Sequence, residues 1–305
     1  DAGEEVENCI AVKDFDEDRF LVMATRNGIV KKTVLTQYSR PKQGGLIAIR
    51  LKEGDELIDV VVVGPGDDVL LSSATGMAIR FPHTNARPQG RATAGVRGIR
   101  LGKGDKLIGI VVARPDQFLL TACENGYGKR TPFGIGGVVP VVDDGGNSEA
   151  ENAEETADGV ESDGIEPETG GSATEESEER SGHHYRSQNR GGKGLRDIRT
   201  TDRNGRAVAI LAVSEDDDVL MVTAGGKIQR VRAAEISLVG RNTQGVRIIR
   251  LDETDKLTSM ARIPGEIIDE AVADGMPADD DTPEVETVDE TETDTDSDDP
   301  PASGE

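Results

Sequence analysis

One short pattern returns three times in this chain and constrains its architecture. The copies are Gly45-Leu-Ile-Ala-Ile-Arg-Leu51, Gly95-Val-Arg-Gly-Ile-Arg-Leu101 and Gly245-Val-Arg-Ile-Ile-Arg-Leu251. A second pattern lies upstream, a Gly four residues before a base: Gly28 with Lys32, Gly76 with Arg80, Gly126 with Arg130 and Gly226 with Arg230. Gly28 and Gly76 are 48 residues apart, and Gly76 and Gly126 are 50 apart. A period of this length indicates a repeat architecture, here with four modules.

Each module has the composition of a small antiparallel sheet. It opens with an apolar run such as Phe20 to Ala24, turns at a dipeptide such as Asn27-Gly28, and continues into a second strand. A polar loop, the Gly-x-x-x-Ile-Arg-Leu segment and a last apolar run follow, as in Leu57 to Val63. Four short strands per roughly 50 residues predict an all-β fold of propeller blades, in which radial repetition protects most sheet edges.

Charge is distributed unevenly along the 305 residues. The formal net charge is -24, but 15 acids and one base lie between Asp143 and Arg180, and 17 acids and no base lie between Glu266 and Glu305. Both segments are poor in aromatic residues and rich in Gly, Ser, Thr and Pro, so we expect them to be disordered. The remaining repeat regions, 19–132 and 183–265, hold 33 bases and 19 acids, which predicts a basic surface of about +14 on the folded part.

Spacing within the modules locates the first acidic segment in a loop. The turn Gly and the later strand Gly are 17 residues apart in the first module and 19 in the second and fourth, but 68 in the third. We therefore expect residues 1–18 to be a linker or partial blade, 133–182 an acidic insertion, and 266–305 an acidic tail that either solubilises the chain or competes for its basic surface. Because the chain begins at Asp1 within an apparent linker, we treat it as a fragment of a longer polypeptide.

The third module carries a loop that the others lack, Gln188-Asn-Arg-Gly-Gly-Lys-Gly194, preceded by Tyr185 and Arg186. Glycines let the backbone approach a phosphate chain, while Arg190 and Lys193 supply charge, and Gln188 and Asn189 supply neutral donors. A plain loop between strands can have the same composition, so phosphate binding and a structural turn both remain open from spacing alone. The predicted loop site consists of Gln188, Asn189, Arg190, Gly191, Gly192, Lys193 and Gly194.

This loop resembles the gyrase box found in the A subunit of DNA gyrase. Met23 to Thr33, Asn125 to Thr131 and Gly240 to Val246 also resemble the C-terminal domain of that protein, and the similarity covers every module. The resemblance implies a β-pinwheel, a propeller-like disc of four-stranded blades whose basic rim wraps duplex DNA and so supports ATP-dependent negative supercoiling. Asn189 replaces the base that usually stands at the second position of the box. The family's principal box lies in its first blade, whereas this one lies in the third of four modules. We therefore expect the four modules to be the last four blades of the domain and their box to be auxiliary.

The resemblance also implies partners and a location. These are double-stranded DNA and, in a heterotetramer, the gyrase B subunit together with the rest of the gyrase A subunit, associated with the chromosome in the cytoplasm. It places the catalytic tyrosine, the ATPase site, ATP and Mg²⁺ in other parts of that enzyme, so we expect no cofactor, metal or catalytic residue here. The two cysteines, Cys9 and Cys123, lie far apart, which fits a reducing compartment, and no signal peptide or membrane-spanning run is visible.

Bases at equivalent places on the second strands form the predicted rim. Together with Arg186 they are Lys31, Lys32, Arg80, Lys129, Arg130, Arg230 and Arg232. For the repeated Arg50, Arg100, Arg199 and Arg250, flanking Ile and Leu favour a structural, paired role instead. The excess of Arg over Lys and the acidic segments suggest a halophilic source.

Two alternatives remain open from the sequence. One is the C-terminal domain of topoisomerase IV, against which the well-formed Gln188 to Gly194 loop counts. The other is a propeller that serves as a protein-interaction scaffold, against which the basic balance counts. A single-strand binder is disfavoured because the chain has only eight Phe and Tyr residues and no Trp on which bases could stack.

Overall fold

The computed structural model describes residues 8–40, 42–134 and 184–267. Most of the predicted acidic insertion and tail, and the first seven residues, lie outside the described residues. In the described part, strands account for nearly all regular structure, together with the short 3-10 helices η1 (Leu35–Tyr38), η2 (His83–Asn85) and η3 (Ala233–Glu235). The predicted all-β fold is confirmed.

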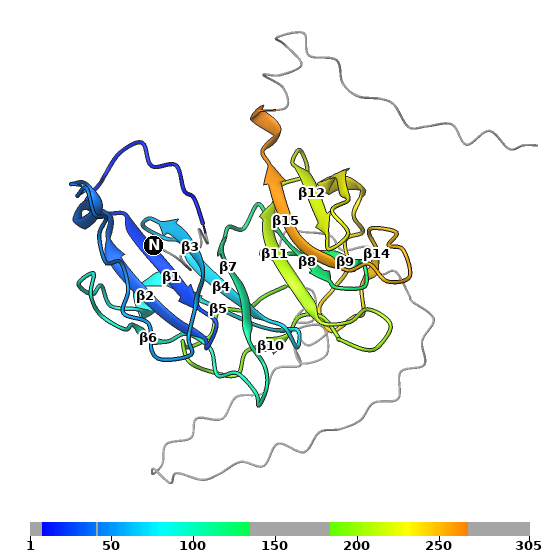
Figure 1. Cartoon of the computed structure of the whole chain (residues 1–305), viewed down its shortest axis with the longest axis horizontal. Coiled ribbons are helices and arrows are strands. Elements are labelled where there is room, and N and C mark those ends of the chain that lie inside the picture. Colours follow the sequence, from blue (N-terminus) through cyan, green and yellow to red (C-terminus); the bar gives the residue numbers. More distant parts are fainter. Residues whose placement is uncertain (1–7, 41, 135–183, 268–305) are drawn as a thin grey trace, which may run out of the picture. The chain divides into compact units, whose positions relative to one another are not determined.

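The strands form four antiparallel sheets, which we call blades 1 to 4 (Figure 1). Blade 1 has the order β3 (Leu57–Val63), β1 (Phe20–Thr25), β2 (Ile29–Val34) and β6 (Val96–Arg97). Blade 2 consists of β7 (Leu107–Ala113), β4 (Asp68–Ser73), β5 (Met77–Pro82) and β10 (Leu195–Arg196). Blade 3 consists of β11 (Ala207–Val213), β8 (Phe118–Cys123), β9 (Tyr127–Pro132) and β14 (Val246–Arg247). Blade 4 consists of β15 (Leu257–Ile263), β12 (Asp218–Thr223) and β13 (Ile228–Arg232).

A blade is not the same unit as a sequence module. The outermost strand of each of the first three blades comes from the next module: β6 pairs with β2, β10 with β5, and β14 with β9. We call the segments that supply these strands the donor segments: Gly95 to Leu101, Gly194 to Thr200 and Gly245 to Leu251, of which the second ends in Thr instead of the Leu of the repeated pattern. The period in the sequence predicts the number of blades, but it does not reveal this exchange, because the period is the same whether a segment pairs within its own module or with its neighbour.

Each hairpin turn requires a glycine. Gly28, Gly76, Gly126 and Gly226 have φ between 77° and 82°, and each donates its backbone N–H to the carbonyl three residues earlier. A Cβ added at Gly76 would lie 2.1 Å from the carbonyl oxygen of Ile198, in the donor segment that covers the turn. The turn glycine thus serves both the hairpin and the seating of the donor segment.

The core lies between successive sheets. Val30 and Ala24 of blade 1 pack in one cluster with Leu71 and Phe81 of blade 2, and comparable clusters join blade 2 to blade 3 and blade 3 to blade 4. The last strand of each module lies at the other edge of its sheet. These strands contact one another in chain order: β3 contacts β7, β7 contacts β11, and β11 contacts β15. Since each cluster combines side chains from two successive sheets, neighbouring blades stabilise one another. In the described ranges, no helix is long and apolar enough to cross a membrane.

Candidate nucleic-acid interface

The donor segments place arginines at the outer edges of the blades. Within each segment Ile99, Ile198 or Ile249 is buried, whereas the arginines on either side of it are exposed. These exposed residues are Arg97 and Arg100 on blade 1, Arg196 and Arg199 on blade 2, and Arg247 and Arg250 on blade 3. Their positions repeat with the blades because they belong to the sequence repeat.

Most of these guanidinium groups are available to a ligand. Among the described residues, no ion pair or side-chain hydrogen bond involves the guanidinium of Arg97, Arg100, Arg196, Arg199 or Arg250. Arg50, in the Gly45 to Leu51 segment of the first module, is also exposed. The expectation that Arg50, Arg100, Arg199 and Arg250 are structurally paired is therefore wrong in this structure: alternation along the segment buries the isoleucine and turns the arginine to solvent.

The box-like loop crosses from blade 2 to the neighbouring donor segment. Gln188 N donates to Arg80 O (2.8 Å). Gly191 N donates to Gly98 O (2.7 Å), and Gly192 O accepts from Arg100 N (2.8 Å). A Cβ added at Gly194 would lie 2.5 Å from Ala78 O, so this glycine is required by packing against β5. Backbone hydrogen bonds and close packing at Gly194 therefore hold the loop in place.

Only part of the loop's charge faces solvent. Arg190 is half-buried and donates to the carbonyl oxygens of Asn85 (3.2 Å) and Arg97, so its guanidinium helps to hold the loop. Arg186, Asn189 and Lys193 are exposed, and Gln188 is half-buried. Of the predicted loop site, Lys193 and Asn189, together with the neighbouring Arg186, are the side chains that a phosphate could reach directly.

The box-like loop has two structural equivalents that the sequence reasoning did not connect. Residues 89–95 and 239–245 occupy the same place in their modules, with Arg91 and Arg241 in the position of Arg190. Arg50 N donates to Thr93 O (3.0 Å) and Arg199 N to Thr243 O (2.8 Å), as Arg100 N does to Gly192 O. The sequence contains the signal for this equivalence, because Arg91, Arg190 and Arg241 each lie four residues before the first glycine of a donor segment.

Four bases of the predicted rim lie in the interior instead. Lys31 and Lys129 are fully buried, and Lys32 and Arg130 nearly so. Lys129 Nζ donates to Asp197 O and Gly240 O (both 2.7 Å) and lies 3.3 Å from the Asp197 carboxylate. Arg130 donates to Ile236 O (2.7 Å) and Ala234 O (3.0 Å). Carbonyl groups of the following loops thus hold these charges, and the structure does not place them at an exposed rim.

The buried lysines differ in their partners. Lys31 Nζ contacts the carbonyl oxygens of Ala48 and Arg91, and no carboxylate of the described residues pairs with it. Burial, together with the positive charge of Arg91, lowers the pKa of Lys31 to about 8. Burial also lowers the pKa of Lys129, but there the Asp197 carboxylate opposes the effect. Lys32 donates to His83 O (2.9 Å) and lies 4.6 Å from the centre of the Phe20 ring.

The remaining rim bases are intermediate cases. Arg80 pairs with Asp68 (2.8 Å) and donates to Phe133 O (2.6 Å), and its side chain is mostly buried. Arg230 pairs with Asp218 but is half exposed, and Arg232 is exposed. Only Arg186, Arg230 and Arg232 of the predicted rim therefore present charge to solvent.

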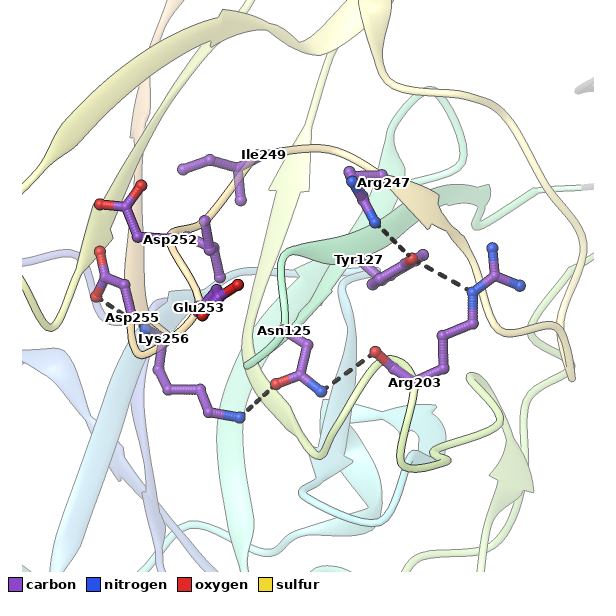
Figure 2. Close-up of a pocket in the computed structure, with 10 residues that line it drawn as sticks. Asn125, Tyr127, Arg203, Arg247, Ile249, Asp252, Glu253, Asp255 and Lys256 are labelled. Carbon is purple, nitrogen blue, oxygen red and sulfur yellow. Dashed lines mark hydrogen bonds between the residues drawn. The ribbon is translucent and has the colours of Figure 1, made fainter.

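A polar pocket lies beside blade 3, where Arg203 and Arg247 approach the hydroxyl of Tyr127 from two sides (Figure 2). Their hydrogen bonds, 3.3 and 3.2 Å long, lower the pKa of Tyr127. Asp252, Glu253 and Asp255 line the same pocket. The carboxylates offset the two guanidinium charges, so the pocket is mixed in charge.

Comparison with known proteins identifies the family. A family model described as the DNA gyrase C-terminal domain, beta-propeller, matches residues 19–64, 67–114, 181–214 and 217–264. The chain belongs to this family. It is 34% identical over 270 residues to the DNA gyrase A subunit of Salmonella typhimurium, covering 88% of this chain and 25% of the relative. It is 35% identical over 274 residues to the same protein of Staphylococcus aureus, covering 89% and 25%. The chain thus spans about a quarter of the length of these relatives.

Solved structures agree with the β-pinwheel fold of the family. The structure of a DNA gyrase A C-terminal domain matches with a TM-score of 0.61 at 24% identity, over 83% of this chain and 68% of that one. The C-terminal domain of a DNA topoisomerase IV matches with a TM-score of 0.66 at 19% identity, over 90% and 72%. At these identities the two structures show the fold, while the family model and the relatives show the gyrase family.

Two of the tyrosines are held by side-chain hydrogen bonds. Tyr185 is buried and donates to the Asp197 carboxylate (2.6 Å), and Tyr127 is held by two arginines. In the described residues no group of three or more His, Cys, Asp or Glu side chains could hold a metal ion.

Proposed function

We propose that this chain binds double-stranded DNA and wraps it with a defined hand, as the DNA-wrapping part of a DNA gyrase A subunit. The observation that carries the proposal is the repetition of exposed, unpaired arginines on the donor segments of three successive blades. Membership of the gyrase C-terminal domain family supports it. Successive blades then offer successive phosphate contacts along one bent duplex.

The chemistry of this surface favours phosphates over base edges. Arginine presents several N–H donors in a planar fork that matches phosphate oxygens. Repeated contacts of this kind read the shape and deformability of DNA and carry little sequence information. At molar salt the screening length falls to about 3 Å, so under such conditions the arginines would act through direct contact.

The wider assembly is part of the same proposal. In it, the chain acts in a heterotetramer with the gyrase B subunit, together with the rest of the gyrase A subunit, within the cytoplasm and on the chromosome. Wrapping presents a DNA segment to the cleavage core so that ATP-driven strand passage introduces negative supercoils. We propose that the catalytic tyrosine, the ATPase site, ATP and Mg²⁺ belong to other parts of this enzyme and that this segment uses no cofactor.

The test is ligation of nicked circular DNA in the presence of increasing amounts of the chain, followed by measurement of the linking number. Chiral wrapping predicts a positive shift that grows with the ratio of protein to DNA. Binding without a shift would reduce the surface to a DNA adhesive, and failure to bind duplex DNA at all would remove the proposal.

A further inference from the structure

Blade 3 encloses a carboxylate that satisfies a buried lysine. Asp197 is fully buried, and its Oδ1 accepts a hydrogen bond from the hydroxyl of Tyr185 (2.6 Å), while its Oδ2 accepts one from Thr121 (2.7 Å). The ammonium of Lys129 lies 3.3 Å from Oδ1 and donates to the backbone oxygens of Asp197 and Gly240. Each of the three N–H donors of this lysine therefore has an acceptor, and its charge has a counter-charge.

Blade 1 repeats this arrangement without the carboxylate. The equivalent residues are Lys31 for Lys129, Thr33 for Thr131, Tyr38 for Tyr185 and Ala48 for Asp197. The lysines and threonines are counted from the turn glycines, and Ala48 and Asp197 from the glycine three residues before each. Both tyrosines match Ala86 of the second module, which stands ten residues after its turn glycine, as Tyr38 does, and nine before its donor-segment glycine, as Tyr185 does. Only the acidic member of the set is replaced in blade 1.

The donors that remain in blade 1 are buried and incompletely used. Lys31 is fully buried and donates to the carbonyl oxygens of Ala48 and Arg91, which accounts for two of its three N–H groups. The hydroxyl oxygens of Thr33 and Tyr38 are buried near one another, and neither has a well-formed hydrogen bond within the described ranges. Because buried polar groups without partners are costly and rare, these donors indicate a ligand.

The polar partners of the blade 3 group all come from the third and fourth modules. Their counterparts in blade 1 therefore come from the first and second modules, which this chain contains. Blade 2 shows that the fold does not require polar residues here, because Ile79, Phe81 and Gly98 stand where blade 1 has its lysine, threonine and alanine. The buried donors of blade 1 are thus a property of that blade and not of the repeat.

Charge favours an anion over a water molecule at this place. In blade 3 the positive charges of Lys129 and Arg241 both act on the Asp197 carboxylate. In blade 1 the equivalent Arg91 adds its positive charge to that of Lys31, and no carboxylate of the described residues pairs with either. A water molecule accepts hydrogen bonds but leaves a buried ammonium without a counter-charge.

The surroundings favour an anion of a single atom. Lys129 and Tyr185 both reach the Oδ1 atom of Asp197, so their counterparts in blade 1 flank the place of that one oxygen. Thr121, which donates to Oδ2, is replaced in blade 1 by Met23, and this methionine is buried. A larger oxyanion would therefore place its second oxygen against an apolar side chain.

We propose that blade 1 binds a monatomic anion of the size of chloride, held by the ammonium of Lys31 and the hydroxyls of Tyr38 and Thr33. The anion takes the place that an oxygen of the Asp197 carboxylate takes in blade 3, and Arg91 adds a second positive charge. Its role is structural, because it satisfies buried donors. This inference rests on the comparison between blades and is independent of the proposed function.

The first test compares thermal unfolding of the full chain in potassium chloride and in potassium gluconate at equal concentration. A ligand that binds the folded state stabilises it increasingly with concentration, so chloride should raise the melting temperature of the wild type above that in gluconate. Ala48→Asp restores the carboxylate and should remove most of this difference. Ala234→Asp adds the same charge at an exposed position and should keep it. Because a bound anion also stabilises the charged form of Lys31, unfolding of Lys31 variants is measured in gluconate.

The second test is the line width of the chloride NMR signal, which does not depend on stability. The wild type should broaden the signal several-fold more than Ala48→Asp, and added bromide should reverse the broadening by competition. Asp197→Ala opens an equivalent place in blade 3 and should increase the broadening. If Ala48→Asp does not fold, Tyr38→Phe takes its place and should also broaden less. Equal broadening by the wild type and these variants, or no broadening by the wild type, would overturn the proposal.

Discussion

At the scale of single residues, the buried lysines should differ in how much their replacement lowers the unfolding free energy. Lys129→Met should cost about 3 to 5 kcal/mol of unfolding free energy, because it leaves the Asp197 carboxylate buried without its cation. Lys31→Met should cost clearly less, because Lys31 is held by carbonyls alone. Chemical denaturation of both variants measures the difference.

The control for this comparison is Lys129→Met combined with Asp197→Ala, which copies the alanine found at the equivalent Ala48. The second substitution should recover part of the stability. Equal costs for Lys31→Met and Lys129→Met would show that the carboxylate is not what makes the Lys129 position sensitive.

Lys31 also gives stability a pH dependence of predictable sign. Its pKa is about 8 in the folded chain and near 10.4 in an unfolded one. Between these values the unfolded chain binds more protons at this site, so the contribution of Lys31 to stability rises as the pH increases through this window. The unfolding free energy of the wild type minus that of Lys31→Met should therefore increase from pH 7.5 to 10, and a constant difference would contradict the assignment.

These lysines also show where sequence reasoning stops. Gly28 to Lys32 and its repeats predicted the turns and second strands, which the structure confirms. The same pattern could not show that Lys129 would be enclosed by Gly240 O and Asp197 O, since those atoms come from residues 111 and 68 positions away. A lysine in a strand usually places its charge in water, and the predicted rim followed from this tendency. In this structure carbonyl groups from distant parts of the chain accept hydrogen bonds from the lysine, so its charge stays in the interior.

At the scale of elements, the turn glycines separate backbone strain from the seating of a donor segment. Gly76→Ala and Gly226→Ala impose the same unfavourable φ, about 1 to 3 kcal/mol. Gly76→Ala also drives a Cβ into Ile198 O, whereas Gly226→Ala meets open space. Gly76→Ala should therefore lower the melting temperature distinctly more, as measured by calorimetry.

Equal losses of stability for Gly76→Ala and Gly226→Ala would mean that the donor segment does not rest on its turn glycine.

At the scale of the whole molecule, the donor-segment arginines should determine how DNA affinity depends on salt. Replacing Arg100, Arg199 and Arg250 with Gln should weaken binding and reduce the slope of log affinity against log salt by about 0.9 for each phosphate that is no longer neutralised. The charge-matched control replaces Arg26, Arg114 and Lys227, whose side chains reach solvent but are paired with Glu56, Asp67 and Asp252. It should change the slope much less.

Two outcomes would relocate the interface. If both triple variants lose affinity equally, net charge rather than position drives binding. If neither changes the slope, DNA binds elsewhere on the chain, and Arg186 and Lys193 of the box-like loop become the next residues to test. Gel-shift titrations at several salt concentrations give both slopes.

The exchange of strands between modules also sets the order in which the chain can mature on the ribosome. Blade 1 runs from Phe20 to Arg97, so its sheet stays incomplete until most of the second module has been synthesised. Blade 2 waits longer, since its last strand ends at Arg196 and the acidic stretch between Asp143 and Arg180 must be made first. At roughly 5 to 20 residues per second, a nascent chain keeps the β5 edge bare for several seconds. During that interval the 15 acids between Asp143 and Arg180 are synthesised, and repulsion between like charges disfavours association of neighbouring nascent chains.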